Sequence, residues 1–119
     1  MITPINIAEK FAKFSDYWSP KIVGQMNDFD IRAVKMSGSF IWHKHVETDE
    51  LFMLVEGSLR IELRDGSVSL NSGDIYVVPK GVEHRPVAES ECHALIISPT
   101  ETINTGDVGG EMTAQDEWI

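Results

Sequence analysis

From residue 21 onward, short hydrophobic runs alternate with turn residues, which is the pattern of β-strands. The runs are rich in Val, Ile and aromatic residues, and pairs such as Asn27-Asp28 and Ser37-Gly38 separate them. They predict strands at residues 21–26, 31–36, 39–45, 51–56, 59–64, 67–70, 75–79 and 92–98. Because no helical segment lies between these runs, we expect an all-β fold, an antiparallel sandwich or barrel.

Asp65-Gly66 is the strongest hairpin signal in the chain. Alternating apolar residues flank it, namely Leu59, Ile61 and Leu63 before it and Val68 and Leu70 after it. This pattern predicts two adjacent strands joined by a two-residue turn, with one apolar face.

The two ends of the chain differ from this strand pattern. Asn6 can cap a short helix that runs through Phe14, because apolar residues fall on one helical stripe there. Residues 100–119 are rich in glycine and acidic residues, as loose tails are, but they finish with Trp118-Ile119. Since two large apolar side chains are costly to leave in water, we expect this tail to dock on the barrel or on a partner subunit.

Composition narrows the class of protein further. The chain has 119 residues, enough for one domain of residues 1–119, and a net charge of -9. This charge disfavours nucleic acid and anionic membranes as partners, and the longest apolar run, from Leu51 to Val55, is far too short to span a bilayer. The single Cys92 excludes an intrachain disulfide and is typical of a reducing compartment, so we expect a cytoplasmic protein.

Three of the four histidines form a pattern that suggests metal binding. His43 and His45 are two residues apart, so on a strand both rings lie on one face and can approach one ion. Glu50 follows a polar, turn-like segment that can return it to the same side, and His84 follows the turn formed by Pro79 and Gly81.

These residues resemble the two motifs of the cupin family. Gly38 followed by His43-x-His45-x4-Glu50-x6-Gly57 resembles the first motif (residues 38–57), with four residues before the first His where five are usual. Gly73-x5-Pro79-x-Gly81-x2-His84 resembles the second motif (residues 73–88), with Ala88 in place of its final Asn. The resemblance implies one cupin domain, a jelly-roll or double-stranded β-helix barrel with a short N-terminal helix.

The resemblance also implies a metal site and a range of functions. In cupins these positions bind one divalent metal, so the implied ligands are His43, His45, Glu50 and His84. Such nitrogen and oxygen ligands suit Mn, Fe, Co, Ni, Cu or Zn rather than Ca. The implied function is that of a metal-dependent enzyme, dioxygenase- or isomerase-like, acting on a small polar organic molecule. The alternatives are a non-catalytic ligand-binding or sensing barrel and a purely structural or storage barrel.

Other residues are candidates for a role beside the metal. His93 could be an acid–base group if its face of strand 92–98 is internal, or else a core or surface residue. Tyr76 could line the pocket or belong to the core. Arg85 could hold a substrate carboxylate, or pair on the surface with Glu83 or Glu89. Cys92 is the weaker candidate, since only His93 could activate it as a nucleophile.

Two aromatic residues suggest an oligomer. If residues 39–45 form a strand whose histidines point inward, Phe40 and Trp42 point outward and need cover. We therefore expect a homodimer.

Overall fold

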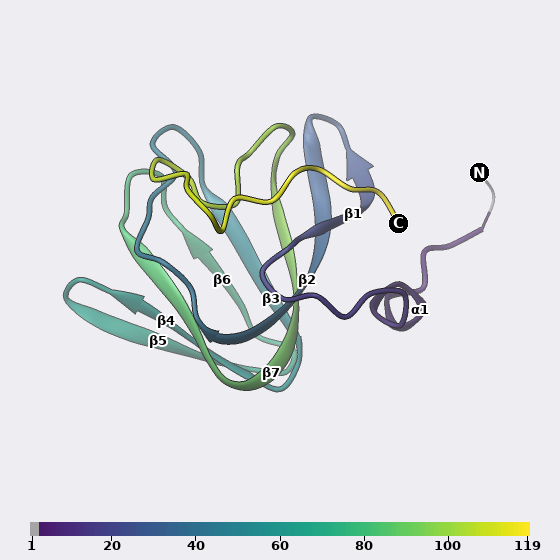
Figure 1. The fold of residues 1–119 in the computed structure, drawn as a ribbon, viewed down its shortest axis with the longest axis horizontal. Helices are drawn as coiled ribbons and strands as arrows, with labels where there is room; N and C mark the ends of the chain where they lie inside the picture. Colours follow the sequence, from purple (N-terminus) through teal and green to yellow (C-terminus); the bar gives the residue numbers. More distant parts are fainter. Residues whose placement is uncertain (1–2) are drawn as a thin grey trace.

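The computed structural model describes residues 3–119, which form seven strands and one short helix (Figure 1). The helix is α1 (Ile7–Phe11), and the strands are β1 (Lys21–Met26), β2 (Phe29–Ser39), β3 (Glu50–Glu56), β4 (Ser58–Leu63), β5 (Gly66–Asn71), β6 (Ile75–Val78) and β7 (His84–Pro99). The predicted all-β fold with a short N-terminal helix is confirmed. Over the described residues, no helix has the length and apolar character that crossing a bilayer would require.

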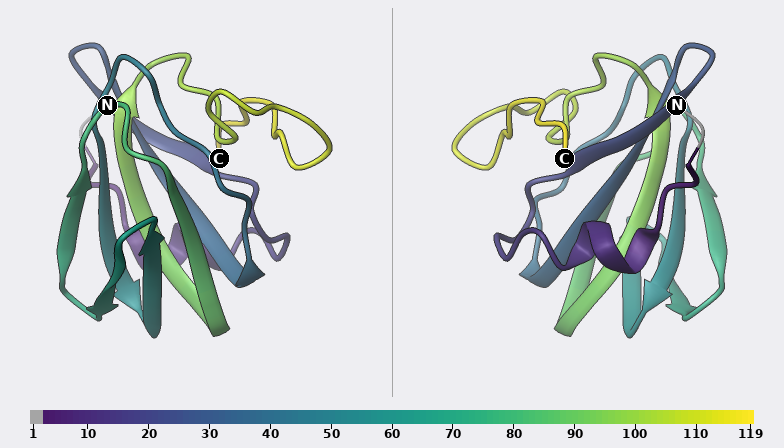
Figure 2. Two further views of the ribbon diagram at one scale, coloured as in Figure 1. Left: turned by 90° about the vertical axis from the view of Figure 1, so that its left-hand side faces the viewer. Right: turned by 90° about the vertical axis from the view of Figure 1, so that its right-hand side faces the viewer.

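The strands form a jelly-roll barrel in which β7 belongs to both layers. Its second half pairs with β2 and β3, in a sheet with the order β1-β2-β7-β3-β6, and the end of β2 also pairs with Val87 and Ala88 in the first half. Its first half pairs with β4, and β5 lies beyond β4. Every one of these strand pairs is antiparallel, and Figure 2 shows the two layers converging along β7.

The core fills the space between the layers, where alternate side chains of the facing strands meet. Its most deeply buried members include Phe52, Leu54 and Ile61. The β4–β5 hairpin is confirmed, although Leu63 pairs with Gly66 and the two turn residues are Arg64 and Asp65, one position earlier than predicted.

Helix α1 lies against the outer face of the larger sheet (Figure 2, right). Asn6 caps it by accepting a hydrogen bond from the Glu9 backbone N–H, as the sequence indicates. The helix ends at Phe11, not at Phe14, and Phe11 packs in one cluster with Ala33 and Leu95.

The predicted strand at residues 39–45 is wrong. Strand β2 ends at Ser39, and the chain then contacts β7 through the Phe40 N–H and through an isolated bridge between His43 and His84. Strand alternation therefore does not apply to this loop, and Phe40 points into the barrel, where its ring stacks 4.8 Å from that of Trp18. The Arg64 guanidinium lies over the Trp42 ring, with its Cζ atom 3.9 Å from the ring centroid. Both aromatic residues are covered within the chain, so they give no argument for a dimer.

Residues 100–119, which we call the C-terminal strap, lie along the open end of the barrel (Figure 1). The backbone of Ile22 in β1 exchanges hydrogen bonds with Glu117 and Ile119. Ile119 packs beside α1, whereas the Trp118 side chain remains 58% exposed. Further along the strap, Gly106 passes so close to Lys44 and His43 that any side chain there would collide with the Lys44 carbonyl oxygen.

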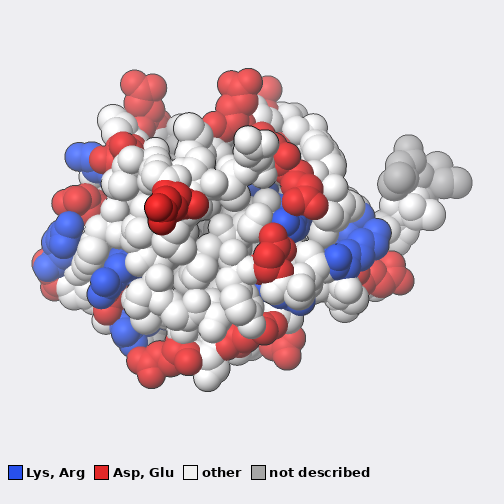
Figure 3. Space-filling view, viewed as in Figure 1, with Lys and Arg blue, Asp and Glu red and all other residues white. Residues whose placement is uncertain are grey.

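Charged side chains on the face shown in Figure 3 do not form one broad patch. Acidic side chains lie along the upper and lower edges, and basic ones gather at the two sides. This mixed distribution on that face is in keeping with the net charge of -9.

Candidate metal centre

Four buried side chains meet inside the barrel: His43, His45, Glu50 and His84. One nitrogen or oxygen atom from each lies within 4.8 Å of the corresponding atom of every other. The two first histidines come from the loop after β2, Glu50 is the first residue of β3, and His84 is the first residue of β7. The structure thus brings together every residue that the sequence proposed as a metal ligand.

Backbone hydrogen bonds hold the two motifs against each other. The backbones of His43 and His84 donate to each other's carbonyl oxygens at 3.1 and 2.9 Å, and the Gly81 N–H donates to His45 O at 2.8 Å. The glycine at position 81 has a φ of 78°, a left-handed conformation that glycine adopts without strain. The turn before His84 therefore fixes the distance between the histidines of the two motifs.

Two of the rings are also oriented by backbone carbonyls. Nδ1 of His43 lies 2.9 Å from Ile41 O, and Nδ1 of His84 lies 3.0 Å from Val82 O. Because a carbonyl oxygen only accepts, the neutral form of each ring carries its proton on Nδ1 and has its lone pair on Nε2. Both histidines are thereby held in the tautomer that a metal ligand needs.

Two buried nitrogens of the cluster have no hydrogen-bond partner, namely Nε2 of His45 and Nε2 of His84. Their nearest acidic atoms are the Glu50 oxygens, at 3.2 and 3.5 Å, but the alignment does not make hydrogen bonds. Buried polar atoms without partners are costly, and here they face the same space as a carboxylate. This arrangement fits a divalent transition metal, for which imidazole nitrogen and carboxylate oxygen are ordinary ligands.

The surroundings of His43 and Glu50 lower the pKa of both groups. Burial and the neighbouring His84 lower the pKa of His43 to about 4, so its imidazole is neutral at physiological pH. Burial would raise the pKa of Glu50, but its contacts with His45 and His84 outweigh that effect and lower the pKa to about 2. The cluster therefore presents neutral imidazole at position 43 and a carboxylate at position 50 to an ion.

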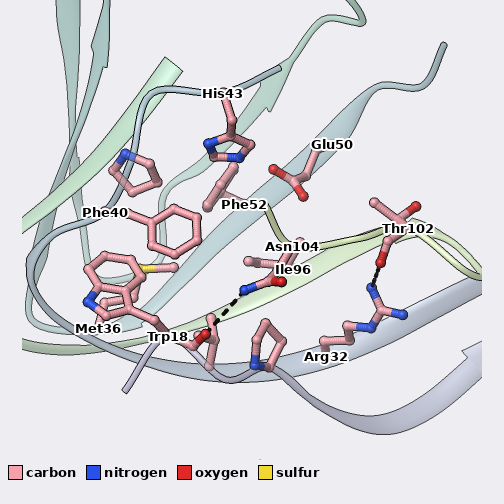
Figure 4. A pocket seen from close by; sticks show the side chains of 13 residues that line it. Trp18, Arg32, Met36, Phe40, His43, Glu50, Phe52, Ile96, Thr102 and Asn104 are labelled. Atoms are coloured by element: carbon pink, nitrogen blue, oxygen red, sulfur yellow. Dashed lines mark hydrogen bonds between the residues drawn. The ribbon is translucent and has the colours of Figure 1, made fainter. Parts of the chain in front are cut away.

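A narrow pocket opens beside this cluster and extends into the barrel (Figure 4). His43 and Glu50 form part of its wall, and aromatic and aliphatic side chains form most of the rest. These apolar residues are Trp18, Pro20, Val34, Met36, Phe40, Phe52, Pro86 and Ile96. Thr102 and Asn104 of the strap and Arg32 of β2 complete the lining.

Comparison with known proteins identifies the family. The Cupin_2 family, described as a cupin domain, matches residues 32–98, more than half of the chain. The chain belongs to this family. The match begins within β2 and ends within β7, so it contains all four residues of the cluster.

Several proteins resemble this cupin in sequence or structure. The YdbB protein of Bacillus subtilis is 35% identical over 81 residues, covering 67% of this chain and 66% of the relative, just under two thirds of its length. A cupin-2 domain protein of Shewanella frigidimarina is 47% identical with a TM-score of 0.79, covering 80% of this chain and 93% of that one. A Neisseria meningitidis protein is 33% identical with a TM-score of 0.75, covering 82% and 100%.

The remaining candidates of this cupin lie away from the four-residue cluster. His93 is on the outer face of β7, where its ring stacks 4.7 Å from that of Phe11 and Nε2 lies 2.7 Å from Glu91. Its face is not internal, so the condition for an acid–base role beside the metal is not met. Arg85 also points out of the barrel and pairs with Glu62 at 2.6 Å, which is neither of the predicted surface partners.

Tyr76 and Cys92 both contribute to the core. Tyr76 lies on the inner side of β6, partly buried and packed on the core cluster, and is not among the residues that line the pocket. Cys92 is fully buried, and burial together with Glu91 raises the pKa of its thiol to about 11. A thiol with this pKa is a poor nucleophile at neutral pH.

Arg32 is the residue of the pocket that the sequence interpretation missed. It shares the strand parity of Val34 and Met36, which are core residues, and a charged residue in such a position is uncommon. Its place on the inward face of the strand was the signal that could have identified it, because a buried arginine belongs either to a structural ion pair or to a binding site.

Proposed function

We propose that this cupin binds one divalent transition metal through His43, His45, Glu50 and His84, and that it is a metal-dependent enzyme. The observation that carries the proposal is the pair of buried imidazole nitrogens without partners, which face the same space as the Glu50 carboxylate. The substrate is a small organic molecule that enters the adjoining pocket. A bound metal of this kind supplies Lewis-acid polarisation of substrate oxygens or activation of dioxygen.

The lining of the pocket favours dioxygenase-like over isomerase-like chemistry. Isomerisation by proton transfer requires a general base within reach of the substrate. Apart from His43 and Glu50, which we assign to the metal, the lining residues include no carboxylate, imidazole, thiol or phenol group. Oxidation at a metal depends less on such a group, and the largely apolar walls exclude water from the reaction.

Two measurements test this proposal in sequence. Protein purified without a histidine tag is analysed for bound metals, and about one transition metal per chain is expected. Oxygen consumption by the metal-loaded protein is then measured with catechols, thiols and 2-oxo acids, and isomerisation is measured with sugar phosphates. Oxygen uptake with at least one substrate supports the proposal, whereas a protein that binds no transition metal contradicts it.

A non-catalytic binding or sensing barrel is the second candidate. The same observation that disfavours an isomerase supports it, because the lining offers no acid–base group beyond the proposed ligands. Under this alternative the metal binds but neither substrate panel is turned over, while a small molecule still binds in the pocket.

We also propose that the chain forms a homodimer through the outer face of β3 and β6. Two cross-strand rows of apolar side chains cover this sheet: Ile31, Ile97, Leu51 and Val77 in one, and Ala33, Leu95, Met53 and Ile75 in the next. The helix α1 packs on Ala33 and Leu95, whereas Met53, Ile75 and Val77 are 38%, 60% and 43% exposed. The rows contain no charge, so two chains of charge -9 can meet here without like charges in contact.

A second copy suits this face, which is open where it ends at the edge strand β6, paired with β3 alone in the sheet order. Two copies can pack these faces together about a twofold axis, which places the same apolar residues opposite each other. Light scattering should give twice the mass of one chain, and Ile75→Glu should give a monomer. Val108→Glu is the matched control, since Val108 is 57% exposed on the strap and lies outside the proposed interface. A monomeric wild-type chain contradicts the proposal.

A cytoplasmic location and the exclusion of nucleic acid and membranes as partners stay predictions.

A further inference from the structure

Arg32 is the only lysine or arginine among the residues that line the pocket, and it is 5% exposed. Figure 4 shows it on the wall opposite Trp18 and Phe40, beneath the strap residue Thr102. Burying a guanidinium is costly unless its charge and its N–H groups are paired. The partners of Arg32 must therefore be compared to see which are firmly held and which can be replaced.

Three acceptors bind the terminal nitrogens of Arg32. Nη1 donates to Thr102 O at 2.9 Å, and Nη2 donates to Asp30 and to Asp116, both at 3.0 Å. These contacts join the guanidinium to a neighbouring side chain of β2, to the backbone of the strap and to a strap carboxylate.

The two carboxylates that bind Arg32 differ in how firmly they are held. Asp30 is 1% exposed on the adjacent inner position of β2, and its other oxygen accepts a hydrogen bond from Gln25 at 2.7 Å. Asp116 belongs to the strap, and its side chain is 57% exposed. Asp30 alone neutralises the charge of the arginine, and Asp116 adds a second negative charge. Because the Asp116 side chain is exposed, it can move away from Arg32 into solvent.

We propose that Arg32 recognises the carboxylate of the substrate, and that Asp116 occupies this position until a substrate replaces it. The inference rests on the proposed function in taking this pocket as the substrate site. It names the substrate class as a small carboxylic acid with a compact apolar or aromatic body. The body lies against Trp18, Phe40 and Phe52, and the acid group pairs with Arg32.

The size of the pocket requires the strap to move when such a molecule enters. The cavity volume is about 30 Å³, room for roughly two water molecules. Thr102 and Asn104 of the strap line the cavity, and both also line a second small cavity, which shares Arg32 with the first and is bounded by Ala114, Gln115 and Asp116. Release of Asp116 from Arg32 would remove one of the contacts that hold the strap beside the pocket.

The test compares acids with their neutral amides as binding probes. Dissociation constants of benzoate, butyrate, benzamide and butyramide are measured by NMR titration of the metal-loaded protein, following the strap amides. The acids should bind more tightly than the amides, and Asp116→Asn should tighten acid binding by about fivefold, the value of an exposed ion pair. The amides should not respond to this substitution.

Glu117→Gln is the matched control. Glu117 pairs with the buried Lys21 at 2.9 Å and its side chain is 59% exposed, almost as for Asp116 with Arg32. Lys21 does not line the pocket, so loosening the strap at this point should leave acid binding within about twofold of the wild type. Equal tightening by both substitutions would assign the effect to strap mobility and would overturn the proposal.

Arg32 variants provide a second comparison. Arg32→Lys keeps the charge and should retain part of the preference for acids, whereas Arg32→Gln should abolish it. Because Arg32→Gln leaves Asp30 buried without its charged partner and can unfold the chain, the decisive variant is Asp116→Asn, whose site is exposed. Acids and amides that bind equally, or acids that bind neither the wild type nor Asp116→Asn, would show that Arg32 is purely structural.

Repeating the titrations after chelator treatment separates this proposal from the proposed function. An acid preference that depends on Arg32 and Asp116 should persist without metal, although weaker. Failure of the chain to bind metal would overturn the metal-dependent function alone. If the chain binds metal but Asp116→Asn does not change its affinity for the acids, the present inference alone would be overturned.

Discussion

The inner and outer faces of the barrel carry histidines from the same strand in opposite environments. His84 lies inside, fully buried, with Nε2 lacking any partner. His93 lies outside, stacked on Phe11 and paired with Glu91. Both are β7 residues, so the strand itself does not decide their roles. The two histidines thus differ in whether a buried ring nitrogen lacks a partner, which is why His84 and not His93 is a proposed metal ligand.

The two faces also differ in what covers them. The barrel interior is closed by the strap, which approaches His43 and Arg32 through backbone and side-chain contacts. Helix α1 covers the outer face around Ala33, Leu95 and His93, whereas its β3–β6 end is exposed. A substitution should thus have consequences that depend on which face its side chain occupies.

Neighbouring residues of β3 should show the largest difference between the faces. Phe52 is 2% exposed inside the barrel, and Phe52→Ala should lower the free energy of unfolding by about 3–5 kcal/mol because it leaves a cavity. Met53 is 38% exposed outside in the single chain, and in the monomeric Ile75→Glu background Met53→Ala should cost about 1 kcal/mol or less. Urea denaturation of both substitutions in that background measures the difference. Equal losses would indicate that Met53 is buried within the single chain.

The two histidines of β7 provide the next comparison. His84→Ala should weaken zinc binding by about a hundredfold or more, close to 3 kcal/mol, because it removes one proposed ligand. His93→Ala should leave zinc affinity unchanged. Titration against a competing chelator measures the affinity, and circular dichroism checks that each variant is folded. An unchanged affinity in His84→Ala would contradict the ligand assignment.

The stability of the metal-free protein should fall as the pH falls. The pKa of His43 is about 4 in the folded chain and 6.5 as its ordinary value, so the unfolded chain binds this proton more readily. Between pH 6.5 and 4 the free energy of unfolding should therefore decrease by about 3 kcal/mol from this group. The pKa of Glu50, about 2 against an ordinary 4.5, continues the loss in the same direction at lower pH.

Urea denaturation at several pH values, in the presence of a chelator, measures this dependence. His43→Gln carries no titrating group at this position, so its stability should change less between pH 6.5 and 4 than that of the wild type. A variant with the same slope as the wild type would refute the assignment of the slope to His43.

The smallest effect is expected for His93→Gln on the outer face. It removes the ring stacked on Phe11 and should cost about 0.5–1 kcal/mol of unfolding free energy. Thermal denaturation is sufficient to measure it. A loss as large as that of Phe52→Ala would mean that the two faces do not differ in the way described.

Local patterns were enough to predict most strands and the hairpin of β4 and β5. Their apolar alternation reflects a barrel with one filled face, so sequence and structure agree there. The convergence of His43, His45, Glu50 and His84 also followed from motif spacing. The metal itself and the reaction are not fixed by that spacing.

The failures share a physical cause, which is that contacts distant in sequence overrode local pattern. Residues 39–45 alternate as a strand does, yet Phe40 turns inward to stack on Trp18. The ion pair of Arg32 with Asp116 joins residues 84 positions apart. No local pattern could indicate that the strap would supply part of the pocket wall.

The central position of β7 has a consequence for how the chain folds. This strand pairs with β2, β3 and β4, so neither layer is complete before residues 84–99 are present. Pairing β2 with β7 closes a long loop, and such closure is slow because its entropy is lost before the contacts form. During synthesis, β2 can therefore pair with β7 only after most of the chain has emerged. The ligand cluster then assembles in the same late step, since His84 begins the strand that completes the barrel.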